Sequence, residues 1–207
     1  FAVGDGNHSL AAAKSVWEET KRSLSTDRVV GHPGRYALVE LINIYDPGLQ
    51  FEAIHRVIFG TGEAFLAEIA DRSDTLVTPA VTFDEMLLLL ADQSVGQRFG
   101  TASAEGFSVV AFTAPSSSLA AGSLQPILDD FARRNPRTRV DYIHGEESTK
   151  RLAQAPGNLG LFLPIISKAD FFHTIVSDGS FPRKTFSMGE ASDKRFYLEA
   201  RSIAPEA

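Results

Sequence analysis

Cysteine is missing from the whole sequence of 207 residues. Disulfides, thiolate zinc sites, iron–sulfur clusters and cysteine nucleophiles are therefore excluded by composition. The absence fits the reducing cytosol, and we expect a cytoplasmic protein. Long apolar runs are missing too: the densest, residues 86–90, is far shorter than the roughly 20 residues that a membrane helix needs. The sequence thus predicts no membrane partner.

Positive charge is scarce. The sequence holds 20 lysines and arginines against 26 aspartates and glutamates, which gives a net charge of −6. This balance disfavours a surface whose main task is to bind phosphate backbones, so we expect no nucleic-acid partner.

The familiar enzyme motifs are also missing. The chain has no Walker loop, GxGxxG, GxSxG or H-E-x-x-H, and no spacing of His, Asp and Glu specifies a metal site. We therefore predict no metal and name no cofactor from motifs alone.

What the chain does contain is enough apolar material for a core, since 43% of its residues are hydrophobic. Its first residues, Phe1 to Gly6, lack an initiating methionine and resemble the end of a buried strand. We therefore expect a single α/β domain over residues 1–207 that forms the C-terminal fragment of a longer protein.

Segments with strand patterns alternate with segments of helical periodicity along the chain. This order predicts an α/β fold in which helices pack against a mixed β-sheet. Thr82 followed by Glu85 is typical of a capped helix start. The turn signal Asp46-Pro47-Gly48 predicts a hairpin between strands over residues 36–45 and 49–58. The other expected strands are 107–113, 139–143 and 159–163. The expected helices are 7–21, fed by a strand, and 63–72, 84–92, 126–134, 146–154 and 167–176, with residues 115–122 as a flexible segment.

The first candidate site is the junction before the helix at residues 7–21. Unpaired N–H groups and the positive end of a helix dipole suit a phosphate or another anion. Here Gly6, Asn7 and Ser9 are candidate ligand-binding residues, Asp5 could hold a hydroxyl or a metal ion, and His8 could move a proton. The alternative is a tight turn whose Asn or Ser caps the helix.

The second candidate is the pair His55 and Arg56, inside an otherwise aliphatic strand. Neighbouring strand residues point to opposite faces, so only one of the two can face a given pocket. Anion binding is one interpretation. A structural bridge from the arginine to a carboxylate, or a position at the sheet edge, is the other.

The third candidate is a basic stretch near the C-terminus of this acidic protein. Guanidinium and ammonium groups near backbone donors are what a phosphate pocket requires. The alternative is a solvated tail with compensating acidic residues. The candidate ligand-binding residues are Lys184, Ser187, Glu190, Lys194 and Arg195, and Arg183 lies beside them.

Lone histidines are more often structural than functional. His144 is a weaker candidate because it follows an expected strand, where α/β proteins tend to place binding residues. His32 and His173 have no supporting context.

Taken together, these segments resemble the uncharacterised prokaryotic proteins of domain-of-unknown-function family 1015. The resemblance is carried by the Asp-Gly-x-His-like turn at Asp5, the His55–Arg56 pair after the turn at Asp46, and the late Lys184-Thr185 element. It extends over nearly the whole chain and implies a preceding N-terminal half, since members are usually about twice this long. It implies no established activity.

The first turn alone is also similar to the Asp-Gly-His-x-Arg phosphate-binding turn of the ParB and sulfiredoxin superfamily, which includes nucleotide-binding proteins and a free-serine kinase. Ser9 stands where that pattern places arginine. The resemblance implies that a guanidinium from elsewhere, with Arg56, Arg183 and Arg195 as candidates, would hold the phosphate.

The functional expectation is a site for an anionic or phosphorylated small molecule. One form is a nucleotide-dependent small-molecule kinase or transferase with Asp5 and His8 as catalytic residues. The alternative is a noncatalytic module that binds a metabolite or docks a partner. Both require Asn7, Arg56 and Lys184 to converge on one cleft.

Overall fold

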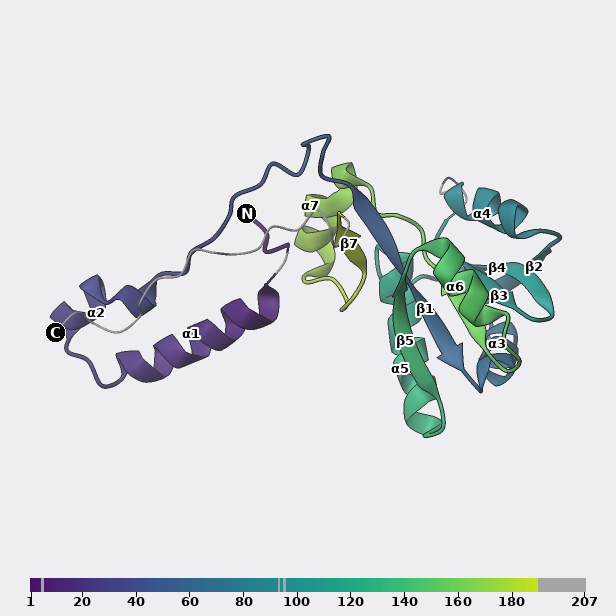
Figure 1. Cartoon of the computed structure of the whole chain (residues 1–207), viewed down its shortest axis with the longest axis horizontal. Coiled ribbons are helices and arrows are strands. Elements are labelled where there is room, and N and C mark those ends of the chain that lie inside the picture. Colours follow the sequence, from purple (N-terminus) through teal and green to yellow (C-terminus); the bar gives the residue numbers. More distant parts are fainter. Residues whose placement is uncertain (5, 93, 95, 190–207) are drawn as a thin grey trace. The chain divides into compact units, whose positions relative to one another are not determined.

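The computed structural model describes residues 1–4, 6–92, 94 and 96–189, which fall into two compact units (Figure 1). In its described part the first unit comprises residues 1–49, and the second comprises residues 50–189. Each is described by itself.

The first unit contains short helical elements joined by irregular chain. They are α1 (Asn7–Lys21), α2 (Thr26–Gly31) and the 3-10 helix η1 (Pro33–Arg35). The Trp17 ring of α1 lies 5.3 Å from the ring of His32, whose Nδ1 accepts a hydrogen bond from the Gly34 N–H at 3.0 Å. His32 is therefore structural: it ties η1 to α1.

Two of our expectations for this unit are wrong. Residues 36–45 form no strand, and no hairpin turns at Asp46. The apolar side chains of this segment are exposed, with Leu38 and Val39 each at 71%, because no neighbouring strand pairs with it among the described residues. β-propensity alone does not make a strand without a partner. Likewise, no strand feeds α1 over residues 1–4, where Phe1 and Val3 are exposed.

The second unit is a sheet with helices on both faces, which confirms the expected α/β class. Its strands run in the spatial order β2-β4-β3-β6-β1-β5, with β7 paired to the start of β1, and every described pairing is antiparallel. The strands are β1 (Phe51–Phe59), β2 (Thr75–Ala80), β3 (Arg98–Ser103), β4 (Gly106–Phe112), β5 (Arg139–His144), β6 (Leu159–Phe162) and β7 (Phe186–Met188). The helices are α3 (Gly62–Ala70), α4 (Phe83–Ala91), α5 (Ala120–Arg134), α6 (Glu146–Ala153) and α7 (Lys168–Asp178).

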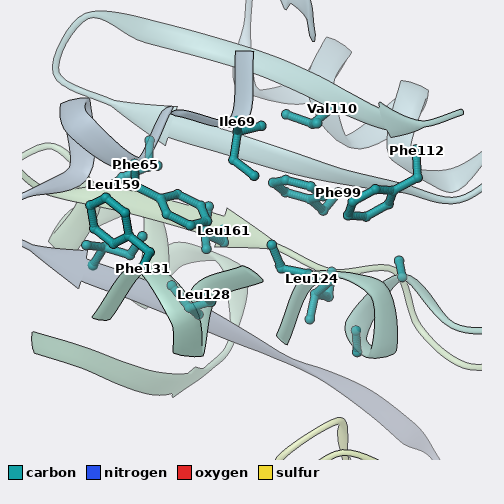
Figure 2. Close-up of a cluster of buried hydrophobic side chains, with 14 residues drawn as sticks. Phe65, Ile69, Phe99, Val110, Phe112, Leu124, Leu128, Phe131, Leu159 and Leu161 are labelled. Atoms are coloured by element: carbon teal, nitrogen blue, oxygen red, sulfur yellow. The ribbon is translucent and has the colours of Figure 1, made fainter. Parts of the chain in front are cut away.

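Two apolar clusters hold four of these helices on the sheet. On one face α3 and α5 cover the strands, and Figure 2 shows Leu124 and Leu128 of α5 below Phe99 and Leu161. On the other face α4 and α6 pack around Met86 and Phe162 (not drawn in Figure 2). Figure 1 shows α6 in front of the sheet and α5 behind it.

The local signals at α4 are confirmed in atomic detail. The Thr82 hydroxyl accepts a hydrogen bond from the Glu85 N–H at 3.1 Å, and the Glu85 carboxylate accepts one from the Val81 N–H at 2.6 Å. This reciprocal arrangement satisfies donors that the helix start would otherwise leave unpaired.

Helix α5 begins six residues earlier than expected. Residues 120–122 belong to the segment that we expected to be flexible, and residues 123–125 were not expected to be helical, but all six are buried and helical. Pro126 lies inside the helix rather than at its start. Burial against the sheet outweighs the weak local preference of this segment.

Candidate functional site

A hollow of about 380 Å³ lies at the N-terminus of α5 in the second unit. This volume is within the usual range for small-molecule sites. The polar residues of its wall come from the start of β3, the loop before α5, helix α7 and the turn before β7. They are Gln97, Arg98, Ser118, Ser167, Asp170, His173, Thr174 and Thr185.

The start of α5 forms one wall of this hollow. Its N-cap residue, Leu119, makes no side-chain capping hydrogen bond. The first N–H groups of a helix have no intrahelical partner, and the helix dipole concentrates partial positive charge there. Ala120 and Ala121, which carry two of these N–H groups, line the hollow and have no bulky side chain to cover them.

Arg98 brings a full positive charge to the same hollow. Its Nη1 donates to the Leu89 carbonyl at 2.9 Å, which holds the guanidinium against the end of α4. Its Nε is buried and has no hydrogen-bond partner among the described residues. A buried donor without a partner is costly, so an acceptor that reached this N–H would be stabilising.

Helix α7 contributes the opposite charge. Asp170 and His173 line the hollow from exposed positions, while Thr174 is buried. The lining is therefore mixed, with Arg98 and the helix terminus on one side and one carboxylate on the other.

A second hollow of about 400 Å³ shares Leu119 and Thr174 with the first. Its wall holds the carboxylate of Asp178, at the C-terminal end of α7, which anchors the loop before α5. The two Asp178 oxygens accept hydrogen bonds from the Ser117 hydroxyl at 2.9 Å, the Ser118 hydroxyl at 2.7 Å and the Ser118 N–H at 2.6 Å. These donors lower the pKa of Asp178, the Ser118 N–H most strongly.

Two further contacts fix this loop. The Gln97 side chain donates to the Ser117 carbonyl and accepts from the Ser123 hydroxyl at 2.9 Å. A side chain at Gly122 would place its Cβ only 2.1 Å from the Ser117 hydroxyl oxygen. The absence of a side chain at position 122 thus lets the serine loop pack directly on the first turn of α5.

The residues predicted for the first candidate site lie in the first unit, except Asp5, which lies outside the described residues. Gly6 is the N-cap of α1, with φ of 76°, and no side chain caps the helix. The Asn7 amide donates to the Val3 carbonyl at 3.3 Å instead. His8 and Ser9 are exposed. The capping alternative therefore does not hold, and the anion-binding interpretation stays a prediction.

His55 and Arg56 lie on β1 and point to opposite faces, as the strand pattern predicts. His55 is buried beside Phe162, with ring centroids 5.0 Å apart, and its Nδ1 accepts a hydrogen bond from the Leu163 N–H at 3.1 Å. Burial, followed by the charges of Arg56 and His144, lowers the pKa of His55 to about 4. The imidazole is therefore neutral at pH 7 and supports the backbone of the neighbouring strand.

Arg56 has no exposed surface and lies on an interior strand, between β5 and β6. Neither form of the structural alternative, a carboxylate bridge or a sheet edge, describes it. Its Nη1 donates to the Ile54 carbonyl, and its Nε and Nη2 donate to the Gln125 carbonyl oxygen at 3.4 and 3.3 Å. Burial lowers the pKa of Arg56 to about 10, which leaves the side chain charged at pH 7.

Tyr142 links Arg56 to the third candidate segment. Its ring centroid lies 5.1 Å from the Arg56 guanidinium carbon and 5.6 Å from that of Arg183. Gln125 donates to the Tyr142 hydroxyl at 3.0 Å and to Asp129 at 2.9 Å, and Asp129 lies 3.6 Å from Arg183. The structure thus brings Arg56 and the segment beside Lys184 together, through a tyrosine and an amide.

The remaining candidates of that segment have separate surroundings. Lys184 is exposed in a turn, with φ of 55°. Ser187 pairs with Glu52 across β7 and β1, and its hydroxyl donates to the Gly189 carbonyl at 3.3 Å. Glu190, Lys194 and Arg195 lie outside the described residues. The Nε2 atom of His144, at the end of β5, lies against the Glu52 carboxylate.

Of these predicted residues, none that the structure describes lines either hollow, and the sequence analysis missed the residues that do. Arg98 begins a strand that we did not predict, Gln97 directly precedes it, and His173 lacked sequence context. The one usable signal was the serine run at positions 116–118, a few residues after a buried strand, which is typical of a loop that leads into a helix N-terminus.

Two kinds of feature are missing from the residues that the structure describes. In that part of the chain no helix is both long and apolar enough to cross a membrane. Within the same ranges, no three histidine or acidic side chains lie close enough together to hold a metal ion.

Comparison with known proteins gives one assignment. No curated protein and no solved structure matches the chain. A family model described as "Protein of unknown function (DUF1015)" matches residues 1–131, more than half of the sequence, and the protein therefore belongs to the DUF1015 family.

Proposed function

We propose that this protein binds a small phosphate-bearing molecule, with the phosphate in the hollow at the N-terminus of α5. The observation that carries the proposal is the meeting, in that hollow, of an uncapped helix N-terminus with Arg98, whose buried Nε lacks a partner among the described residues. The N–H groups of Ala120 and Ala121 and the guanidinium are donors of the kind that phosphate oxygens accept.

The physical case rests on unsatisfied donors. A bound oxyanion would accept from the helix N–H groups and from Arg98 at once, and these charge-assisted bonds are stronger than neutral ones. The partial burial of the hollow strengthens each interaction relative to bulk water.

The proposal concerns binding. The catalytic roles of Asp5 and His8, and with them phosphoryl transfer, stay predictions from the sequence, because Asp5 is outside the described residues and His8 belongs to the first unit. The similarity of their turn to that of the ParB and sulfiredoxin superfamily is likewise a hypothesis.

Nuclear magnetic resonance of the whole chain tests the proposal directly. Inorganic phosphate is titrated at constant ionic strength while the amide signals of Ala120 and Ala121 are followed. We expect saturable shifts of these two signals, and in Arg98→Met about tenfold weaker binding, since a charge-assisted contact contributes roughly 1.4 kcal/mol or more.

The matched control is Arg151→Met on α6, which removes an equal charge from an exposed position that lines neither hollow. It should leave the phosphate affinity unchanged. Signals that do not saturate, or equal losses in both variants, would contradict a specific site at α5.

A further inference from the structure

The second hollow differs in chemistry from the first. Hydroxyl groups dominate its polar lining, and among the described residues no Lys, Arg or His takes part in its wall. The polar side chains are those of Ser116, Ser117, Thr174, Ser177, Asp178 and Ser180. Such a wall suits a polar group without negative charge.

The Asp178 carboxylate fixes the direction of several of these hydroxyl protons. Within this wall, the Ser117 hydroxyl donates to it at 2.9 Å, and the Ser177 hydroxyl has two acceptors, Asp178 at 3.0 Å and the Thr174 carbonyl at 3.2 Å. A hydroxyl has one proton and two lone pairs, so a serine that donates to Asp178 has only lone pairs left for another molecule. At Ser117 and Ser177 the hollow therefore favours an occupant that donates hydrogen bonds.

A neutral donor fits better than a cationic one. Asp178 accepts from three hydroxyls and from the Ser118 N–H, which together occupy the roughly four acceptor positions of a carboxylate. A cationic group placed here would therefore find no free acceptor position on this carboxylate. Alcohol hydroxyls are the donors that remain suited to such a wall.

The hollow also has an apolar side formed by Phe181, Pro182 and Leu119. The Phe181 ring lies 5.3 Å from that of Phe171 and 5.8 Å from that of Phe186, which holds it in place. A fixed aromatic ring opposite a row of hydroxyls is suited to a molecule with C–H groups on one side and hydroxyls on the other.

We propose that the phosphate-bearing molecule is a sugar or polyol phosphate, whose hydroxyl-bearing carbons occupy this second hollow. The inference rests on the proposed phosphate site, because the hollows share Leu119 and Thr174 and because the consecutive residues Ser117 and Ser118 line one hollow each. A phosphate at α5 would thus have its organic part within reach of the serine-lined wall.

The test compares three probes on the full chain by calorimetric titration: inorganic phosphate, ribose 5-phosphate and n-pentyl phosphate, which has five carbons but no hydroxyls on them. We expect ribose 5-phosphate to bind at least about tenfold more tightly than pentyl phosphate, since each hydroxyl that finds an acceptor adds to affinity.

Two variants locate the effect. Ser177→Ala removes a hydroxyl from the second hollow and should weaken ribose 5-phosphate binding several-fold while leaving inorganic phosphate unaffected. Ser148→Ala, on α6 and outside both hollows, should change neither affinity.

The outcomes separate the two proposals. If inorganic phosphate does not bind, the proposed function fails. If phosphate binds but pentyl phosphate binds as tightly as ribose 5-phosphate, only the polyol inference fails. It fails also if ribose 5-phosphate is preferred but Ser177→Ala leaves that preference intact, because the hydroxyls are then recognised elsewhere.

Discussion

The guanidinium of Arg56 is fully buried and is held by the neutral side chain of Gln125. A buried charge usually has a charged partner, because leaving water is costly. The Gln125 amide links this guanidinium to a carboxylate. Its oxygen accepts hydrogen bonds from Arg56, and its NH₂ group donates one to Asp129 at 2.9 Å. The charge of Arg56 is thus compensated at a distance, through one hydrogen-bonded side chain.

Replacing Gln125 should therefore be strongly destabilising. In Gln125→Leu the Arg56 guanidinium would lose the acceptor of its Nε and Nη2 groups, and we expect a loss of about 2–3 kcal/mol in the free energy of unfolding. Urea denaturation followed by circular dichroism measures it.

The double variant Arg56→Met with Gln125→Leu provides the control. Removing both partners leaves no buried charge, so we expect it to be more stable than Gln125→Leu alone. A double variant that loses the sum of both single effects would show that the two side chains act independently.

His55 should make stability depend on pH. Its pKa is lowered from about 6.5 to about 4 in the folded protein, so the unfolded state binds a proton first as the pH falls. The contribution of His55 is complete above pH 6.5, is lost between pH 6.5 and 4, and changes no further below pH 4. Its full size is about 3 kcal/mol.

Comparison with His55→Gln isolates this contribution from that of the carboxylates. We expect the variant to be less stable at pH 7.5, because the acceptor for the Leu163 N–H is disturbed, but to lose less stability than the wild type between pH 7.5 and 4.5. Equal losses would mean that His55 titrates normally.

Two glycines should respond differently to alanine. A Cβ at Gly62 would lie 2.7 Å from the backbone of Asn158, whereas one at Gly100 would meet the end of the Met86 side chain at 2.8 Å. The backbone cannot move aside, while methionine changes rotamer easily. We expect Gly62→Ala to lose about 2–3 kcal/mol and Gly100→Ala about 1 kcal/mol or less in thermal unfolding. The reverse order would contradict this packing.

Asp178 should control the order of the serine loop. Asp178→Asn keeps the shape of the side chain but removes the charge, so the bond from the Ser118 N–H weakens. We expect faster hydrogen exchange of the Ser118 amide in the variant. In the wild type, the depressed pKa of Asp178 means that protection is present at neutral pH and is lost only in strong acid. Unchanged exchange in the variant would show that Gln97 alone holds the loop.

Local sequence patterns predicted much of the second unit, because the residues that form each pattern also contact one another in the structure. The start of α4 is an example: Thr82 and Glu85 interact within four residues, so the sequence contains the whole arrangement. The face assignment of His55 and Arg56 followed from strand alternation in the same way.

The site could not be predicted on that basis. Arg98, Ala120 and His173 come from three elements, and only the fold brings them to one hollow. The partnership of Arg56 with Gln125 spans 69 residues of sequence. The prediction of a strand over residues 36–45 was wrong for a related reason. An apolar segment becomes a strand only when it pairs with a neighbouring strand, and sequence patterns do not reveal this pairing.

The position of β2 at the outside of the sheet has a consequence for self-association. An outermost strand offers free backbone groups to which another chain could add. Pro79 lies within β2, opposite Ser108 of β4, and has no N–H to give. An incoming strand would find a missing donor near the C-terminal end of this edge, so fibril-like growth from β2 is disfavoured.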